Sequence, residues 1–215
     1  MACTPTKPPQ DVSALQDLVK DYLTRKHEWD KFPDMDEATS QEWHDIYLSS
    51  LEDMTDFICG EKNTTKVPDG PEYILNSHQW YLGYPRYKHV VNEMAENLKD
   101  IGAQNFENFE QLIDYVKEKK VKFFGDTSVY DIALRYGWNQ NPPIKPEKFV
   151  YIHSKPWKAA KHLVEHGYLK KIKKLENLER KMELEKYQEL LLPGMTASDV
   201  ENFLCCYHKD IIKLK

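Results

Sequence analysis

Apolar residues recur three or four positions apart over most of the chain, the spacing that places side chains on one face of an α-helix. The first such stretch ends near residue 26 and follows Asp11 and Ser13, either of which can cap a helix. The last is introduced by Pro193-Gly194, with Thr196 or Ser198 as its cap. The pattern predicts eight helices, over residues 13–26, 40–59, 85–99, 106–119, 126–137, 157–164, 172–190 and 197–211.

One segment of the chain has a different, β-rich pattern. Residues 149–153, Phe-Val-Tyr-Ile-His, follow the Pro142-Pro143 break and predict one strand or an extended segment. We therefore expect an all-α fold, a single multi-helix domain over residues 11–215 with at most one short strand. Residues 1–10 contain three prolines and predict a disordered lead-in.

Several classes of protein are excluded by what the sequence lacks. It has no run of about 18 apolar residues and no signal peptide, so we expect an intracellular protein, cytoplasmic or nuclear, without a membrane partner. No sequence motif of a phosphate loop, zinc protease, serine hydrolase or calcium sensor occurs, and we expect no cofactor. The four cysteines, Cys3, Cys59, Cys205 and Cys206, show no metal-binding spacing and predict reduced, structural thiols rather than a zinc site completed by His208.

The charge is distributed unevenly along the chain. The formal net charge is -5, yet residues 145–174 hold nine lysines against Glu147 and Glu165, a local balance of +7. The remainder of the chain therefore carries -12. This asymmetry predicts either a basic face that binds nucleic acid or an acidic protein, or a solvated lysine surface.

Residues 121–133, VKFFGDTSVYDIA, have the form of a helix end, a tight turn at Gly125 and a second helix. This segment resembles the hairpin of the helix-hairpin-helix DNA glycosylase superfamily. Gly125 matches the second hairpin glycine, whereas Phe123 stands at the first glycine position and Lys122 where the superfamily has proline. The resemblance covers at most residues 85–165.

This resemblance implies a DNA-binding protein that cleaves or modifies the base of a flipped nucleotide. The superfamily has an aspartate some twenty residues after the hairpin, and Glu147 is the carboxylate at about that separation here. Thr127 occupies the approximate place of the lysine nucleophile that some members use.

The neighbouring side chains suggest chemistry independently of any family. Asp131 and Arg135 are four positions apart beside Tyr130, so an arginine can orient the carboxylate, or the two can form an ordinary helix ion pair. Tyr151 and His153 alternate on one face of the extended run, where His153 can bind phosphate or shuttle a proton, or can simply end a buried strand.

A third group of residues is rich in aromatic side chains. Residues 76–89 include His78, Gln79 and Trp80, which suit contact with a flipped base, although an aromatic linker packed under a helical domain has the same composition. We expect the catalytic residues to be Asp131, Arg135, Glu147 and His153. We expect the substrate-binding residues to be His78, Gln79, Trp80, Tyr130, Tyr151, Lys155 and Lys158. The alternative is a noncatalytic helical module that docks nucleic acid or an acidic protein through its basic C-terminal third.

Overall fold

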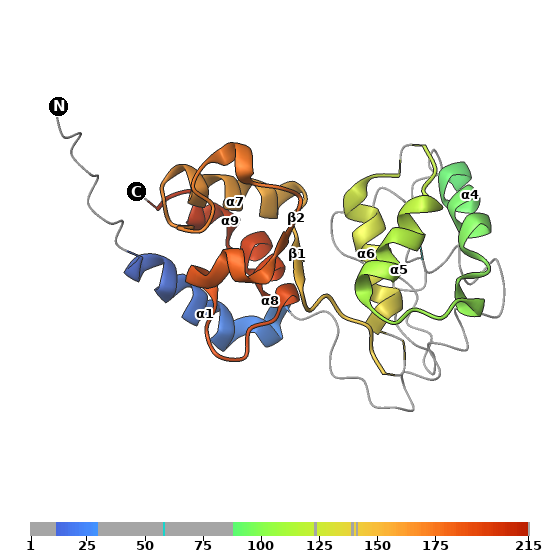
Figure 1. Cartoon of the computed structure of the whole chain (residues 1–215), viewed down its shortest axis with the longest axis horizontal. Helices are drawn as coiled ribbons and strands as arrows, with labels where there is room; N and C mark the ends of the chain where they lie inside the picture. The colour runs from blue at the N-terminus through green and yellow to red at the C-terminus, as the bar shows by residue number, and fades with distance from the viewer. Residues whose placement is uncertain are drawn as a thin grey trace. The chain divides into compact units, whose positions relative to one another are not determined.

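The computed structural model describes residues 12–29, 58, 88–122, 124–138, 140 and 142–214. The predicted lead-in, and the predicted helix over 40–59 apart from Ile58, lie outside these residues. Backbone contacts divide the chain into two compact units, shown in Figure 1: unit 1 comprises Met1–Trp29 and Glu147–Lys215, and unit 2 comprises Asp30–Pro146. The sequence predicts one domain over 11–215. Hydrophobic periodicity shows which face of a helix is buried but not which distant helix covers that face, so it does not predict this division into units.

Unit 1 combines both ends of the chain. Figure 1 shows the first helix beside α8, and the two helices are in contact. The described elements of unit 1 are α1 (Ser13–Trp29), β1 (Phe149–Tyr151), α7 (Ser154–Glu165), η5 (Leu175–Asn177), β2 (Lys181–Glu183), η6 (Leu184–Leu190), α8 (Ala197–Cys206) and α9 (His208–Ile211).

The core of unit 1 is built from the apolar faces that the helical spacing predicts. Leu15 and Val19 of α1 are buried with Leu163 of α7 and Phe203 of α8. The Thr196 side chain accepts a hydrogen bond from the backbone N–H of Asp199, and the Asp199 side chain accepts one from the backbone of Thr196. This capping box confirms Thr196 as the cap of the last long helix.

The helix predicted over residues 172–190 is wrong. That stretch holds the short 3₁₀ helix η5, then β2, then the 3₁₀ helix η6. β2 pairs antiparallel with β1 in the register Phe149↔Glu183, Val150↔Met182 and Tyr151↔Lys181. Lysine, glutamate and leucine favour helices, and their spacing here is compatible with one. The strand forms instead because it pairs with β1, whose Val150 is buried in the core. This pairing joins distant segments, so the local pattern of residues 172–190 does not contain it.

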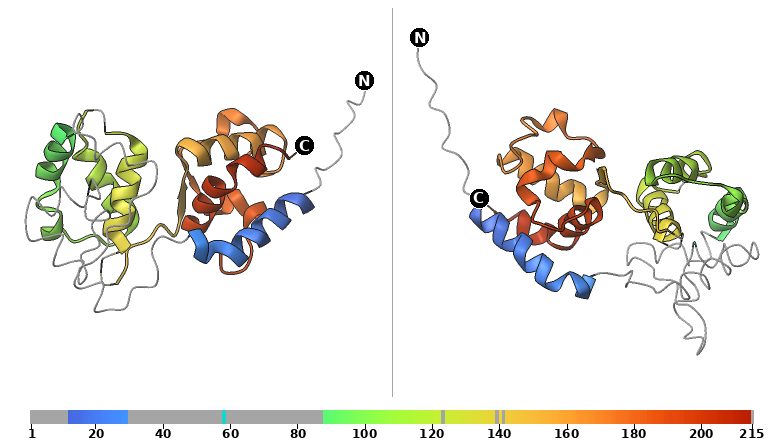
Figure 2. Two further views of the ribbon diagram at one scale, coloured as in Figure 1. Left: turned by 180° about the vertical axis from the view of Figure 1, so that it is seen from behind. Right: turned by 60° about the horizontal axis from the view of Figure 1, so that its bottom comes forward.

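Unit 2 is described over three α-helices and one short 3₁₀ helix, drawn from two further sides in Figure 2. These are α4 (Lys88–Leu98), η4 (Ile101–Ala103), α5 (Phe109–Glu118) and α6 (Asp126–Trp138). α5 packs on α6, and every residue of α6 from Ser128 to Gly137 is buried. This unbroken burial makes α6 the central helix of the described part of unit 2.

The chain after α6 folds back onto its end. The backbone N–H of Ile144 donates to the Gly137 carbonyl at 2.8 Å, and a Cβ on Gly137 would lie 2.2 Å from the Ile144 carbonyl oxygen. This approach requires glycine at position 137.

The described structure is mostly helical, with one two-stranded sheet, and this confirms the predicted all-α fold. The predicted helices over 13–26, 85–99, 106–119, 126–137 and 157–164 correspond to α1, α4, α5, α6 and α7. The predicted helix over 197–211 is interrupted at Tyr207, between α8 and α9. Within the described ranges, no helix combines the length and the apolar character needed to cross a membrane.

Candidate functional site

α7 has one buried face and one strongly basic face. Pro156, Ala159, Ala160, Leu163 and Val164 are buried, whereas Lys155 and Lys158 are exposed. The helix ends at Glu165 and is followed by Gly167, whose φ is +74°, and the backbone N–H of Tyr168 donates to the Leu163 carbonyl at 2.8 Å. This left-handed ending turns the chain into the exposed lysines of residues 170–174.

Most lysines of residues 145–174 have no acidic partner among the described residues. Lys161 pairs with Glu165 at 3.7 Å and Lys174 with Glu176 at 3.3 Å. Five exposed lysines on α7 or shortly after it have no ion pair in the described part of the chain, and we call them the α7 lysine surface: Lys155, Lys158, Lys170, Lys171 and Lys173. The predicted substrate-binding residues Lys155 and Lys158 thus lie on one accessible surface.

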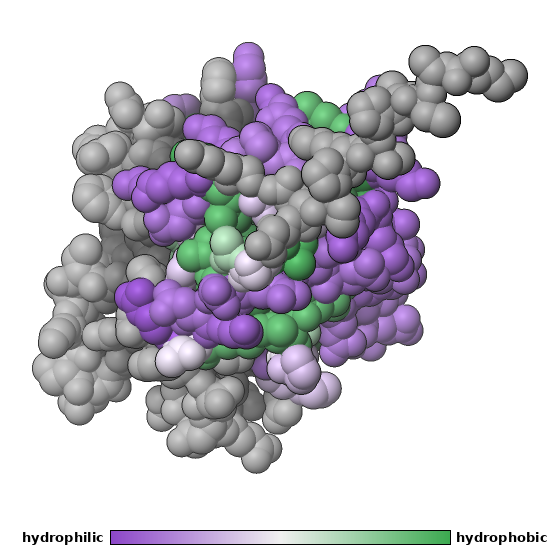
Figure 3. Space-filling model, turned by 90° about the vertical axis from the view of Figure 1, so that its left-hand side faces the viewer, coloured by the Kyte–Doolittle hydropathy of each residue, from purple (hydrophilic) through white to green (hydrophobic). Residues whose placement is uncertain are grey.

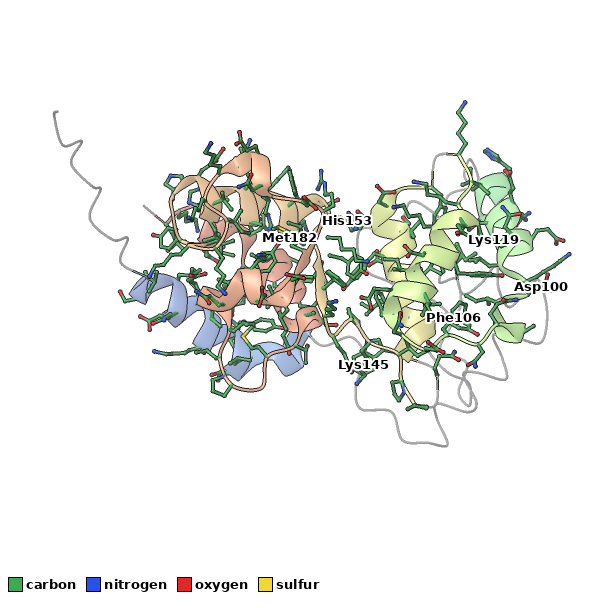
Figure 4. All side chains as sticks on the ribbon, in the orientation of Figure 1. Asp100, Phe106, Lys119, Lys145, His153 and Met182 are labelled. Carbon is green, nitrogen blue, oxygen red and sulfur yellow. The ribbon has the colours of Figure 1, made fainter. Side chains whose placement is uncertain are left out.

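Cations lie over aromatic rings at two places, one at the start of α7 and the other on the β-ribbon. The Arg180 guanidinium carbon is 3.9 Å from the centre of the Trp157 ring, and Arg180 Nη1 donates to the Ile152 carbonyl at 3.4 Å. Figure 4 labels His153 and Met182, which mark the two chain segments that meet here.

The second of these places is centred on Phe149. Lys181 Nζ lies 4.5 Å from the centre of the Phe149 ring and 5.5 Å from that of Tyr151, and Lys148 Nζ lies 5.1 Å from that of Phe149. We call these six residues the cation–aromatic row: Lys148, Phe149, Tyr151, Trp157, Arg180 and Lys181.

Sequence reasoning missed Arg180 and Lys181. It assigned them to a helix, and they reach the row only because β2 pairs with β1. The signal that could have found them is that Lys181 and Glu183 are polar and flank the apolar Met182. This alternation has a period of two residues, which is typical of a strand.

An open acidic hollow of about 450 Å³ borders the row. It is lined by Glu147, Lys148, Glu183, Leu184, Glu185 and Leu191. Glu147, predicted as a catalytic carboxylate, is exposed here. Glu183 is the cross-strand partner of Phe149, so its carboxylate is on the same face of the ribbon as that ring. The hollow therefore sets a negative boundary on one side of a basic surface.

Of the other predicted residues of unit 1, Tyr151 belongs to the row and His153 directly precedes α7. Tyr151 is buried in β1, and His153 is the half-buried residue that precedes α7. The His153 side chain makes no capping hydrogen bond to that helix.

In unit 2, Asp131 and Arg135 are almost entirely inaccessible, with 3% and 0% of their surface exposed. Arg135 Nε donates to the backbone carbonyl of Asp131 at 3.3 Å, a contact that holds the guanidinium against its own helix. Tyr130 is also buried, with its ring edge-to-face against Phe109 at 5.9 Å. The predicted catalytic residues are thus divided between the two units, and those of unit 2 belong to the centre of a buried helix.

The predicted hairpin is the turn between α5 and α6. The Gly125 carbonyl accepts from the backbone N–H of Val129 at 3.1 Å, and a Cβ at Gly125 would meet nothing within 4 Å. This open side leaves room for the backbone approach that the resemblance implies. Asp126, however, opens α6 with a carboxylate 2.7 Å from Lys120 Nζ, so a negative charge already lies at the positive end of that helix.

Among the described residues, the predicted cysteines and His208 form no metal site. His78, Gln79 and Trp80 lie outside the described residues. Cys205 and Cys206 are half-buried and not joined in a disulfide, and His208 is bonded through Nδ1 to the Cys205 carbonyl at 3.0 Å. No cluster of three or more metal-ligating side chains occurs among the residues that the structure describes.

The surface of unit 1 is not uniformly polar. Figure 3 shows a face on which hydrophilic side chains surround a patch of hydrophobic ones. Among the described residues the large hydrophobic side chains with most exposure are Ile212, at 49%, and Leu175, at 36%.

Comparison of the chain with models of protein families, with curated proteins and with solved structures finds no match.

Proposed function

We propose that this protein binds nucleic acid through unit 1, with the α7 lysine surface as the main phosphate contact. The observation that carries the proposal is the group of five exposed lysines, on and shortly after one helix, that pair with none of the described carboxylates. Phosphates that contact such lysines release their counterions, which drives binding. Within the part of the chain that the structure describes, these five lysines have no ion pair that must be broken first.

The cation–aromatic row favours nucleic acid over an acidic protein as the partner. Carboxylates of a protein need cations alone, whereas a nucleic acid offers both phosphates and flat bases that stack on aromatic rings. The row contains two half-buried rings, Phe149 and Trp157, each with a cation over it. Both kinds of contact are therefore available on unit 1.

Cleavage or modification of a flipped base remains a separate proposal, supported by the resemblance around Gly125. Its carboxylate would be Asp131, buried in unit 2, or Glu147, exposed beside the acidic hollow. Binding through the α7 lysine surface requires neither.

The binding proposal is tested by fluorescence anisotropy with labelled duplex and single-stranded oligonucleotides over a range of salt concentrations. The double variant Lys155→Glu, Lys158→Glu is compared with Lys20→Glu, Lys213→Glu. The control makes the same charge change at exposed lysines that pair with Asp17 and Asp210.

We expect the first double variant to lose about tenfold or more in affinity and to lower the salt slope by about 2, one unit for each lost phosphate contact. Equal binding by both double variants contradicts the proposal. Competition by polyglutamate as effective as that by nucleic acid, at equal charge, would assign the surface to an acidic protein instead. Release of abasic sites from the same duplexes tests base cleavage in parallel.

A further inference from the structure

We infer that the cation–aromatic row is a binding site for single-stranded nucleic acid, with bases stacked on Phe149 and Trp157 and a phosphate held by Arg180. This inference rests on the proposed function and names its substrate class. It is independent of the α7 lysine surface in its residues, so the two can be tested separately.

The row is built on a fixed backbone. Val150 and Ile152, which alternate with Phe149 and Tyr151, are fully buried in the core of unit 1. The backbone N–H of Ile152 donates to the Arg180 carbonyl at 2.8 Å, which extends the pairing of β1 with β2 beyond its last ladder pair. The rings therefore keep their positions when a ligand arrives, and little conformational entropy is lost on binding.

Arg180 is held in place without being neutralised. Its guanidinium lies on the Trp157 ring and donates through Nη1 to the Ile152 carbonyl, and none of the described carboxylates forms an ion pair with it. The Arg180 side chain is exposed. A planar guanidinium fixed on one face and accessible on the other is prepared to bind a phosphate through its remaining N–H groups.

Phe149 is covered by cations that can move aside. Lys148 and Lys181 approach its ring through long flexible side chains, and neither has an acidic partner in the described part of the chain. A base can replace these ammonium groups on the ring, while the ammonium groups turn to the adjoining phosphates. Stacking of one base on an aromatic side chain is typically worth about fivefold to a hundredfold in affinity.

The use of aromatic rings distinguishes a single strand from a duplex. Bases of a duplex are stacked on one another and present only their edges, so Phe149 and Trp157 add little to duplex binding. Phe149 and Trp157 are half-buried and retain accessible surface. The lysines of α7, by contrast, contact phosphates of either form equally well.

The acidic hollow sets the path of the strand. Glu183 lies opposite Phe149 on the ribbon, and Glu147 and Glu185 line the hollow beside Lys148. These carboxylates repel phosphates on that side. A strand on Phe149 therefore leaves the ring on the side away from the hollow.

The test compares a twelve-residue oligothymidine and a twelve-residue oligouridine with a hairpin duplex of equal charge, using the full-length protein. Phe149→Leu removes the ring and keeps an apolar side chain, and Phe149→Tyr is the matched variant that keeps the ring. Trp157→Phe tests the second stacking position through fluorescence, because a base stacked on tryptophan quenches its emission. Circular dichroism melts verify that each variant is folded.

We expect the wild type to prefer both single strands over the duplex. Phe149→Leu should lose about fivefold or more in single-strand affinity with duplex affinity and its salt slope unchanged, and Phe149→Tyr should bind like the wild type. Trp157→Phe should remove most of the fluorescence quenching. Oligothymidine binding as well as oligouridine places recognition in the base and phosphate, whereas a preference for oligouridine adds the ribose hydroxyl as a contact.

Equal affinity of the wild type for duplex and single strands, or equal loss of both in Phe149→Leu, overturns this inference and leaves the binding proposal standing. Failure of the binding proposal is a different result: no effect of Lys155→Glu, Lys158→Glu on either form.

Discussion

The Tyr22 hydroxyl donates a hydrogen bond to the Asp199 carboxylate at 3.3 Å, across 177 positions of the chain. The same carboxylate caps α8 through Thr196. Tyr207, which follows α8, donates to Asp21 of α1 at 2.5 Å. The two ends of the chain are therefore joined by a reciprocal pair of tyrosine–aspartate contacts, and these fix the frame that carries α7 and the β-ribbon.

Substitution of Tyr22 and substitution of Asp199 should lower the free energy of unfolding by different amounts. Tyr22→Phe deletes one hydrogen bond and should lower the free energy of unfolding by about 1 kcal/mol. Asp199→Ala deletes that bond and the capping box together and should cost about 2 kcal/mol. Urea unfolding followed by circular dichroism measures both. Equal losses would show that the cap contributes nothing.

The Tyr207 contact makes stability depend on pH in the alkaline range. Burial, followed by the hydrogen bond to Asp21, raises the pKa of Tyr207 to about 12 from its ordinary value of 10.0. Because the folded state favours the protonated hydroxyl, this stabilisation is complete below pH 10 and is lost as the pH rises toward 12. The melting temperature of the wild type should therefore fall more steeply from pH 9 to pH 11 than that of Tyr207→Phe. Parallel curves would contradict this coupling.

Most helices were predictable because their stabilising pattern is local. The 3, 4 spacing of Leu15, Val19 and Tyr22 in α1 is a property of adjacent turns, and so is the cap at Thr196. The segment 172–190 was not predictable in this way. Its strand depends on pairing with β1, some thirty residues earlier, while its composition favours a helix.

In the candidate site too, local patterns predicted some features, whereas others depend on contacts between distant segments. Exposure of Lys155 and Lys158 follows from their place on an amphipathic helix, and the sequence pointed to both. Arg180 reaches Trp157 only through the ribbon register, which no spacing within residues 172–190 contains. Asp131 and Arg135 were correctly placed on one helix, but burial on all sides of α6 depends on neighbours that its own sequence does not specify.

Gly137 should tolerate substitution less well than Gly125, another glycine of unit 2. Gly137→Ala sets a methyl group 2.2 Å from the Ile144 carbonyl oxygen and should cost about 2 kcal/mol or more, as overpacking does. Gly125→Ser is the control, since position 125 has open space and serine is a good helix cap. Thermal melts should show a clear loss for the first variant and none for the second. A DNA affinity reduced by Gly125→Ser would support the hairpin contact that the resemblance implies.

Asp131→Asn separates a structural role from a catalytic one. The carboxylate is buried one helical turn from the fully buried Arg135, so loss of its charge should destabilise the protein by about 2 kcal/mol or more. Asp126→Asn alters an exposed pair with Lys120 and should cost under about 1 kcal/mol. Melts of both variants are read beside release of abasic sites. An Asp131→Asn protein that melts like the wild type and has lost base release would establish the catalytic role instead.

Glu183→Gln should strengthen the binding of single strands. The substitution keeps the size of the side chain opposite Phe149 and removes a negative charge from the edge of the cation–aromatic row. Repulsion between that charge and a phosphate is screened over a distance of about 10 Å at 0.1 M salt, so the gain should be about twofold to fivefold at low salt and should vanish near 1 M. Asp17→Asn, an equal charge change on α1, is the control and should leave the affinity unchanged. Anisotropy titrations at both salt concentrations measure the difference. An equal gain from both variants would assign it to net charge alone, and the strand would then have no defined path past Glu183.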